Sequence, residues 1–554
     1  MLRRSRRVGA AMAGIVGLGL LTVPTAGAAE QPPQPVTAGA LPTPQTDGIV
    51  LSMAIVGDTV YAGGHFSKAR PAGVAPGGAG EVTRDNLLAF DLGTGELLDW
   101  SPSVTSTEFE SSADPGPLCD SLGENRWRCD TVFNVTAAPD DSRVYVGGDF
   151  DRINDRWRSR LAAFDPADRT LVDGFDPRVA GRVRALSATE DTVYLGGAFD
   201  SVDGTDRTRL AAVSTSGELL PWSPTADATV HSLLAAPEQR RTLIGGAFDN
   251  VNGRSHVALT AVDDTTGADV PWQWEAPSAA DVVTDIDTDG SGRAYIGSYN
   301  WDGGNVDRFE GRGAVRIEDG STVWMDGCYG DTQSVAVSEG VVYAASHTHA
   351  CAALDAIPED GPIDYQRLTA ETAGATGTAP RDTNHVAEGD PVPELLPWLP
   401  NTNGGPEDSP WQNGTWAIEA NSEYVVVGGE FTTVNGERQQ SLTRFAARSV
   451  PDAVNNGPQI PFRAPDVRRE WLSGDVTIEW TGTWDAQNRS IRYEVIRVGE
   501  SEPIHTVTKE SWPWSLPTMR FTDTDAPGGS TEYWIRAVDA DGASIGSPRG
   551  STDW

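Results

Sequence analysis

The sequence predicts an all-β protein, a seven-bladed β-propeller followed by a small immunoglobulin-like β-sandwich. Three observations support this fold class. A hydrophobic segment ending in a glycine pair recurs along the chain, helical periodicity is nowhere sustained, and the repeat stops after Pro465, where a different alternating pattern begins. A fixed repeat period is typical of solenoid and propeller architectures and outweighs any single motif.

The repeated segment is clearest in Val144–Phe150, which reads VYVGGDF. Near copies and two eroded copies occur at Val60–Phe66, Val193–Phe199, Thr242–Phe248, Ala294–Asn300, Val342–Thr348 and Val425–Phe431. The starts are separated by 84, 49, 49, 52, 48 and 83 residues. Each unit holds four strand-like runs divided by Asp, Asn and Gly turns, which is the chemistry of antiparallel hairpins. Four strands repeated seven times predict a propeller, whose radial arrangement protects sheet edges.

Two further features recur in the units and indicate packing between sheets. The fourth strand-like run carries an aromatic residue, namely Trp100, Phe175, Trp222, Trp272 or Trp274, Trp324, Trp398 and Phe462. A large aromatic residue present in every unit predicts a wedge between neighbouring sheets. The glycine pair has a similar interpretation, because a residue without a Cβ lets another backbone approach closely.

The chain divides into four segments. Residues 1–29 have a basic start, a short apolar run and an A-x-A end, which predict a secretory signal peptide cleaved after Ala28 or Ala29. A membrane anchor is the weaker alternative, because the apolar run is short for a bilayer span. Residues 30–46 are expected to be a linker, residues 47–464 the propeller and residues 465–554 the sandwich. The protein is therefore expected to be secreted.

Charge and cysteine content narrow the possible partners. The chain has 42 Lys and Arg against 79 Asp and Glu, a formal net charge of −37, and the predicted signal peptide removes four of the arginines. This balance argues against nucleic acid and against insertion into an anionic membrane. Four cysteines in an exported chain predict two disulfides, Cys119–Cys129 and Cys328–Cys351. We expect a monomer whose partner is an extracellular glycan or protein.

The repeats resemble kelch-like propellers, and most of all secreted bacterial propellers built from tandem V-Y-x-G-G-x-F units. The C-terminal residues are similar to a fibronectin type III module, with Trp480 in the second strand, Tyr493 in the third and Tyr533 before the last. The second resemblance implies a spacing or adhesion role, in a module that often accompanies polysaccharide-degrading enzymes. Neither resemblance supplies catalytic residues, because propellers host many unrelated functions.

Departures from the average repeat gather in units six, seven, one and two. After the glycine pair, the variable residues in units one to seven are His65, Asp149, Ala198, Ala247, Tyr299, His347 and Glu430. At the start of the first strand, the corresponding residues are Asp47, Asp130, Gly181, Ala228, Ala280, Asp331 and Gly414. Two insertions, near residues 104–129 and 357–394, belong to the same sector.

These side chains define a candidate binding sector. Its acids and imidazoles are Asp47, His65, Asp130, Asp149, Asp331, His347, His349 and Glu430. They would suit a divalent cation or general acid–base chemistry at a channel mouth. The alternative is that equivalent residues point between sheets, too far apart to share a ligand.

A calcium site is the one cofactor hypothesis that the sequence offers. Asp285, Asp287 and Asp289 have the D-x-D-x-D-G spacing of a calcium loop, but the twelfth position is Ile296 instead of an acid. The run also aligns with a hairpin turn, so turn chemistry is the alternative. We expect no other cofactor.

The sequence contains no H-E-x-x-H motif and no phosphate-cradling glycine loop, and its seven histidines are scattered along the chain. The first functional hypothesis is therefore a non-catalytic binding or adhesion protein that recognises a glycan, a cell-wall polymer or a protein. The second is a secreted carbohydrate-active hydrolase or lyase whose paired acids converge on folding. A structural surface-layer component is the third.

Overall fold

The computed structural model describes residues 32–300, 308–359, 365–383 and 385–552. Within these ranges the chain is almost entirely β-structure, with two short 3₁₀ turns, η1 (Pro237–Gln239) and η2 (Ala352–Leu354). No helix in the described ranges is long and apolar enough to cross a membrane. The predicted signal peptide lies outside the described residues.

Each repeat unit forms one antiparallel sheet, in which the second strand of the unit lies between the first and the third. The first unit contains β2 (Ile49–Val56), β3 (Thr59–His65) and β6 (Leu87–Asp91); the second contains β11 (Val132–Ala137), β12 (Val144–Gly148), β15 (Leu161–Asp165) and β16 (Thr170–Leu171). The third contains β17 (Val179–Ala188), β18 (Thr192–Val202) and β20 (Leu210–Ser214); the fourth contains β21 (Val230–Ala236), β22 (Arg241–Gly246) and β25 (Leu259–Asp263); the fifth contains β26 (Asp281–Thr288), β27 (Arg293–Asn300), β28 (Arg312–Arg316) and β29 (Thr322–Met325). The sixth contains β30 (Thr332–Ser338), β31 (Val341–Thr348) and β32 (Gln366–Thr372), and the seventh contains β35 (Thr415–Ala420), β36 (Tyr424–Gly429) and β39 (Leu442–Ala446).

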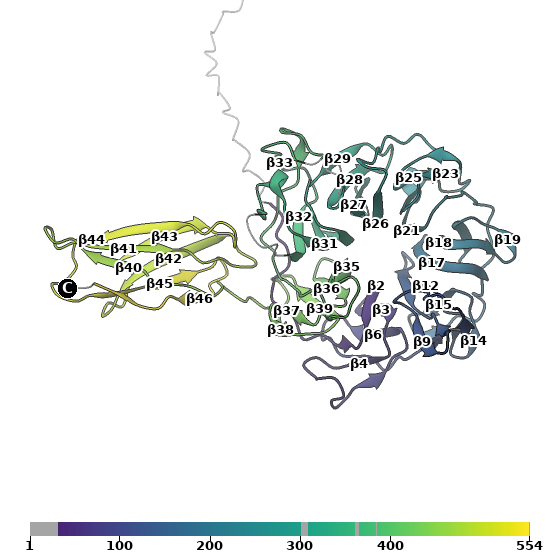
Figure 1. Ribbon diagram of the computed structural model, residues 1–554, viewed down its shortest axis with the longest axis horizontal. Helices are drawn as coiled ribbons and strands as arrows, with labels where there is room; N and C mark the ends of the chain where they lie inside the picture. Colours follow the sequence, from purple (N-terminus) through teal and green to yellow (C-terminus); the bar gives the residue numbers. More distant parts are fainter. Residues whose placement is uncertain (1–31, 301–307, 360–364, 384, 553–554) are drawn as a thin grey trace, which may run out of the picture. The chain divides into compact units, whose positions relative to one another are not determined.

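The sheets are arranged radially around a common centre (Figure 1). The first strand of each unit contacts the first strand of the next unit, and β35 of the last unit contacts β2 of the first, so the first strands form a closed ring. Apolar side chains fill the space between neighbouring sheets, as with Tyr61 and Trp100 of the first unit, which pack with Val146 and Phe164 of the second. This topology is that of a β-propeller.

The last sheet is completed by the start of the described chain. The backbone N–H of Thr37 donates to the carbonyl of Ala446 at 2.8 Å, and the N–H of Leu41 donates to the carbonyl of Arg444 at 2.8 Å. Residues 37–41, which the sequence analysis placed in a linker, thus form the outer edge of this sheet and join the two ends of the ring. Phe462, expected to be the aromatic residue of this unit, instead belongs to the core of the C-terminal sandwich.

The glycine pair explains how the sheets fit together. A Cβ on the first glycine would meet a β-branched side chain of the next unit, for example Val183 at 2.6 Å from Gly147. A Cβ on the second glycine would meet the first strand of its own sheet, for example the carbonyl oxygen of Arg182 at 2.1 Å from Gly197. The predicted structural role of the pair is therefore supported by two separate close approaches.

Opposite each glycine pair, the first strand contains a β-bulge. In the third unit, Val183 pairs with Gly197 and Ala185 pairs with Gly196, which leaves Arg184 without a partner residue. The same shift occurs at the equivalent place in the other units and leaves out Leu51, Phe133, His231, Thr284, Gln333 and Trp416. A bulge re-aims the side chain of its extra residue. We call these seven residues the bulge ring.

The C-terminal residues form two further antiparallel sheets. One contains β40 (Asp466–Arg469), β41 (Val476–Thr481) and β44 (Thr518–Asp523), and the other contains β43 (His505–Glu510), β42 (Ser490–Arg497), β45 (Glu532–Val538), β46 (Ser544–Gly546) and β47 (Gly550–Ser551). Trp480, Tyr493 and Tyr533 are buried in their shared core. The Tyr533 hydroxyl donates to Asp523 at 2.8 Å.

Besides the main strands of the seven units, the propeller contains short hairpins and edge strands. They are β1 (Gln45–Thr46), β4 (Lys68–Arg70), β5 (Val82–Thr83), β7 (Val104–Thr105), β8 (Phe109–Glu110), β9 (Asp120–Gly123), β10 (Arg126–Arg128), β13 (Arg152–Ile153), β14 (Arg156–Trp157), β19 (Thr205–Asp206), β23 (Asn250–Val251), β24 (Arg254–Ser255), β33 (Gly377–Thr378), β34 (Pro391–Val392), β37 (Thr433–Val434) and β38 (Glu437–Arg438). Both predicted disulfides are present, Cys119–Cys129 in the first insertion and Cys328–Cys351 in the sixth unit.

Candidate functional site: a cavity at the centre of the propeller

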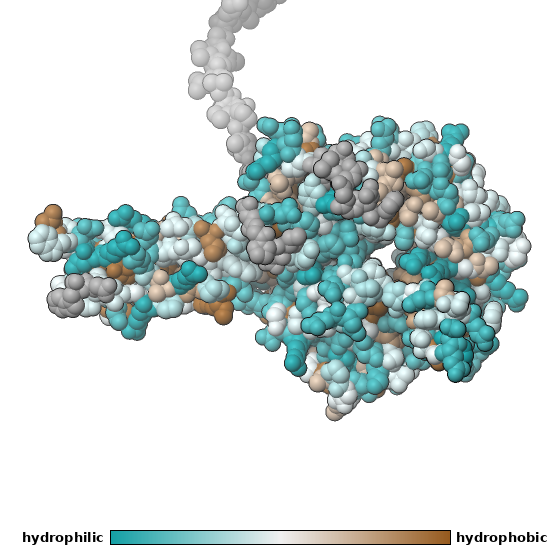
Figure 2. Space-filling view, in the orientation of Figure 1, coloured by the Kyte–Doolittle hydropathy of each residue, from teal (hydrophilic) through white to brown (hydrophobic). Residues whose placement is uncertain are grey.

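The ring of first strands encloses a cavity of about 650 Å³. All seven residues of the bulge ring line it, together with Trp411, Tyr299 and Asp331. The space-filling view shows this face of the propeller hollowed at its centre (Figure 2). The sheet register therefore brings one side chain from every unit to a common space, and these side chains are chemically different.

Three carboxyl groups line the same cavity further along the first strands, and we call them the channel acids: Asp285, Asp287 and Glu419. Asp285 accepts hydrogen bonds from the Ser334 hydroxyl at 2.6 Å and from the Val335 N–H at 3.1 Å. Asp287 accepts from the Val337 N–H at 2.7 Å. Among the described residues, the Glu419 carboxyl group has neither a hydrogen bond nor an ion pair.

Burial controls the protonation of the channel acids. It raises the pKa of Asp287 to about 7 and also raises the pKa of Asp285. Burial also raises the pKa of Glu419 well above its usual value, and the neighbouring charges of Asp287 and Asp285 add to this shift. Like charges in a shared site disfavour full ionisation. The group therefore holds protons close to neutral pH.

The stability of the protein should depend on pH through Asp287. Its carboxyl ionises near pH 7 when folded but near its ordinary value of 3.8 when unfolded, so the folded state binds the extra proton between these limits. The stability that this proton contributes is present below about pH 4 and is lost as the pH rises to 7. Asp287→Asn should flatten this decline and raise the free energy of unfolding at pH 8 by on the order of 2 kcal/mol.

Urea unfolding at pH 4.5 and pH 8 measures this effect. Asp206→Asn, in an exposed hairpin, is the matched control and should unfold as the natural protein does at both pH values. Parallel pH profiles for the natural protein and Asp287→Asn would contradict the assignment.

The run from Asp285 to Asp289 does not form a calcium-type loop. Asp285 and Asp287 belong to β26, an extended strand, whereas Asp289 lies in the following turn and accepts hydrogen bonds from the Ser291 N–H at 2.8 Å and the Tyr295 hydroxyl at 2.9 Å. A loop must curl for its alternate residues to surround one ion. The strand instead directs Asp285 and Asp287 to hydrogen bonds with β30.

Of the predicted sector, Asp331 lines the central cavity. The His347 Nε2 accepts a hydrogen bond from the Asp331 N–H at 3.3 Å, so this nitrogen carries no proton. Burial lowers the pKa of His347 to about 4 and raises that of Asp331 to about 7. The 3.9 Å contact between His347 Nε2 and the Asp331 carboxylate is consequently not an ion pair, since an ion pair would shift both pKa values the other way.

His349 and Glu430 have separate local partners. The His349 Nδ1 lies 3.5 Å from the Glu359 carboxylate, and its ring stacks on Tyr329. Glu430 accepts hydrogen bonds from the Asn413 N–H at 3.1 Å and from the Trp416 indole N–H at 3.3 Å. Glu430 therefore orients one member of the bulge ring without lining the cavity itself.

The other predicted residues lie away from the central cavity. Asp47, His65 and Asp130 line a second hollow of about 450 Å³. Asp47 accepts a hydrogen bond from the Ser67 N–H at 2.8 Å. His65 Nε2 lies 3.4 Å from Asp120, and Asp130 forms an ion pair with Arg128 at 2.9 Å. Asp149 pairs with Arg182 at 2.8 Å.

The sequence analysis aligned Asp47, Asp130 and Asp331 as equivalent residues at the start of the first strand. They are not equivalent in the structure, because the first strands begin at different distances from the bulge. Counted from the bulge, Asp331 precedes its bulge residue by two positions, Asp130 by three and Asp47 by four. Residues at different distances from a bulge lie at different places along the chain, and all three acids precede the first residue of their strand. The three acids are therefore not equivalent, and the structure divides them between two hollows.

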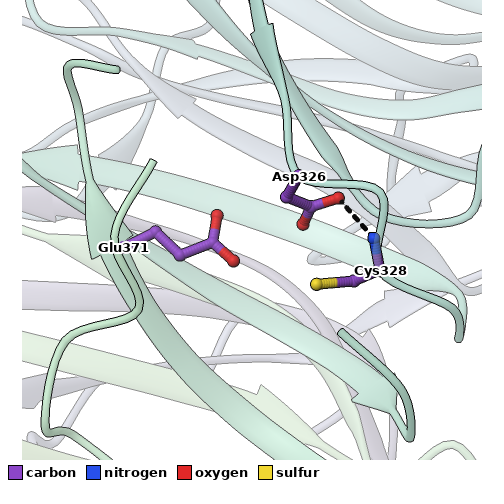
Figure 3. A group of neighbouring side chains, drawn as sticks. All are labelled: Asp326, Cys328 and Glu371. Carbon is purple, nitrogen blue, oxygen red and sulfur yellow. Dashed lines mark hydrogen bonds between the residues drawn. The ribbon is translucent and has the colours of Figure 1, made fainter. Parts of the chain in front are cut away.

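A compact group of potential metal ligands lies between the fifth and sixth units. Asp326, Cys328 and Glu371 point toward one another (Figure 3), and an oxygen or sulfur atom of each lies within 4.8 Å of the others. The sulfur of Cys328 is in a disulfide, and Arg312 Nε lies 2.8 Å from Asp326 and also pairs with Glu371. The arginine supplies the positive charge, so this is a buried ion-pair cluster.

No family model and no curated protein matches the chain. Solved structures that match this chain include the WD40 β-propeller domain of Doa1, with 11% identity, coverage of 75% of this chain and 97% of that chain, and a TM-score of 0.32. The Dos1 propeller matches with 10% identity, 74% and 96% coverage and a TM-score of 0.34. The extracellular domain of the hybrid two-component system BT3049 of B. thetaiotaomicron matches with 9% identity, 92% and 97% coverage and a TM-score of 0.16. By its own strand topology, this chain is a β-propeller protein.

Proposed function

We propose that the protein is a secreted binding protein that holds an extracellular glycan in the central cavity. The seven sheets would form a seven-bladed propeller, and residues 465–554 would serve as a fibronectin type III spacer. The observation that carries this proposal is the convergence of the bulge ring on one cavity. Ligand pockets combine apolar and aromatic surface with a few placed polar groups.

The composition of the lining favours a sugar over an apolar ligand. Trp411 and Trp416 pack edge to face with ring centroids 5.4 Å apart, and Phe133 and Tyr299 line the same cavity. Aromatic faces pack against the C–H faces of sugars, while Asn413 and the other polar groups can bond the hydroxyls. Glu430 fixes the Trp416 indole through its N–H, which would prepare the ring for binding.

Trp416→Ala should weaken glycan binding by about tenfold or more, because it removes both apolar area and a preorganised face. The natural protein would first be applied to a glycan array, and the affinity of each ligand found would then be measured by calorimetry. Trp471→Ala is the control, since this tryptophan is 93% exposed in the sandwich. Equal affinities for Trp416→Ala and the natural protein would count against the central cavity as the binding site.

The channel acids favour a second candidate, a carbohydrate-active hydrolase or lyase. A carboxyl group protonated near neutral pH can serve as a general acid, and Asp287 and Glu419 both have raised pKa values. The two functions differ in their products. New reducing or unsaturated ends after incubation of bound glycans with the protein would favour the enzyme, and recovery of intact glycans would favour the binding protein.

A further inference from the structure

Arg184, the bulge residue of the third unit, has an unusual environment for this acidic chain. Its guanidinium lies over the Phe133 ring, 4.3 Å from the ring centroid, and faces the central cavity. Among the residues that the structure describes, it forms no ion pair and no hydrogen bond. The nearby Asp149 is already paired with Arg182 at 2.8 Å. Buried arginines elsewhere in the chain without a carboxylate, such as Arg70 and Arg84, donate to backbone carbonyls, so a guanidinium with neither kind of partner requires an explanation.

Apart from the paired Arg182 and Asp149, the groups near Arg184 that line the cavity include two neutral hydrogen-bonding side chains, His231 and Tyr299. Burial, aided by the Arg184 charge, lowers the pKa of His231 to about 4, so this imidazole is uncharged at neutral pH. Burial and the charge of Asp331 raise the pKa of the Tyr299 hydroxyl, and the charge of Arg184 opposes this shift, so Tyr299 is also uncharged at neutral pH. This side of the cavity thus combines one fixed positive charge with two neutral groups that can donate hydrogen bonds.

A partly buried charge without a counter-ion costs stability. Stacking on Phe133 compensates for only part of that cost, because a cation–π contact is weaker than a buried, hydrogen-bonded ion pair. The guanidinium fork remains free to form two parallel hydrogen bonds with a planar anion. Such an arrangement is expected where the counter-ion belongs to the ligand.

The channel acids do not prevent an anion from binding. Their raised pKa values leave part of the group protonated near neutral pH, which reduces repulsion. They belong to the fifth and seventh units, whereas Arg184 belongs to the third. A ligand with one carboxylate and several hydroxyls would match this separation of charge.

We propose that Arg184 binds the carboxylate of a uronic acid residue, so that the glycan recognised by the cavity is an acidic one. This inference rests on the proposed glycan-binding function and specifies its ligand class. Phe133 holds the plane of the guanidinium, which binds the two carboxylate oxygens, and His231 and Tyr299 donate hydrogen bonds to the other oxygens of the sugar. The bulge that re-aims Arg184 therefore determines specificity.

The test uses the mature protein and pairs of oligosaccharides containing galacturonate, glucuronate or mannuronate–guluronate, each beside its carboxyl-reduced counterpart. The natural protein should bind at least one acidic member about tenfold or more tightly than its reduced partner. Arg184→Gln should abolish this preference, because it weakens binding of the acidic member about tenfold or more relative to binding of the reduced member. Arg184→Lys should retain part of the preference, because it keeps the charge but loses the bidentate geometry. Arg438→Gln, in an exposed hairpin, is the control.

The outcomes separate the two proposals. Tight binding of neutral glycans by both the natural protein and Arg184→Gln would overturn the uronate assignment and leave the glycan-binding function standing. Preference for sulfated over carboxylated sugars, tested in a parallel arm, would also overturn it. Binding of no glycan by the natural protein would overturn both proposals. Thermal unfolding verifies folding, and Arg184→Gln should melt no lower than the natural protein because it removes an uncompensated charge.

Discussion

Arg312→Met should lower the free energy of unfolding by about 3–5 kcal/mol, the largest single-residue effect that we expect. The Arg312 side chain is 1% exposed and lies between two buried carboxylates, with Nε 2.8 Å from Asp326 and a second nitrogen bonded to Glu371. Its remaining nitrogen donates to the Thr348 hydroxyl at 2.9 Å. Methionine fills a similar volume but leaves both carboxylates without a cation. Urea unfolding at pH 7 measures the loss.

Arg156→Met is the matched control, because Arg156 pairs with Asp173 and both side chains are more than half exposed. An exposed pair of this kind contributes about 0–1 kcal/mol. A second comparison removes all three charges at once, with Arg312→Met, Asp326→Asn and Glu371→Gln. If unpaired charge is the cause, the triple variant should be more stable than Arg312→Met alone. Similar losses for Arg312→Met and Arg156→Met would contradict the argument.

The sequence was sufficient to predict the repeat and the role of its glycines, because both depend on local sterics. Gly147 must admit Val183 of the next sheet, and Gly197 must admit the backbone of its own first strand. Such approaches exclude other residues, so they leave a pattern that recurs in each unit. The two disulfides could be predicted equally well, since each joins cysteines that are neighbours in the sequence.

The edge formed by residues 37–41 could not be predicted in the same way. Thr37 bonds to Ala446, more than four hundred positions later, and no local pattern records such a pairing. The approach of Glu419 to Asp285 and Asp287 is hidden for a similar reason. These acids lie on different units, and ring closure alone brings them together.

The bulge ring was missed although the sequence contains a signal for it. In each unit a β-branched residue that packs near the glycine pair is followed by a chemically variable residue, as in Val183-Arg184 and Thr415-Trp416. Counting from the start of each strand hides this column, because the strands begin at different distances from the bulge. Counting from the β-branched residue would have aligned the cavity-lining side chains.

Gly197→Ala should cost about 2–3 kcal/mol of unfolding free energy and should also weaken ligand binding. The new Cβ would lie 2.1 Å from the carbonyl oxygen of Arg182 and 3.1 Å from the N–H of Arg184. Backbone cannot move aside as a flexible side chain can, so the strand must shift as it would in an overpacked core. The shift begins at the bulge, and Arg184 would be displaced with it. Unfolding in urea and calorimetry with the glycan bound by the natural protein measure the two effects.

Gly174→Ala is the control for this prediction, because no atom lies within 4 Å of its added Cβ. It should leave both stability and binding close to those of the natural protein. The comparison tests the link between repeat motif and site. If Gly197→Ala lost stability but bound the glycan with natural affinity, the glycine would serve only sheet packing. A loss of both properties would mean that the second glycine of the repeat positions the cavity-lining side chain opposite it, so that one repeated constraint builds the fold and presents a different functional group in every unit.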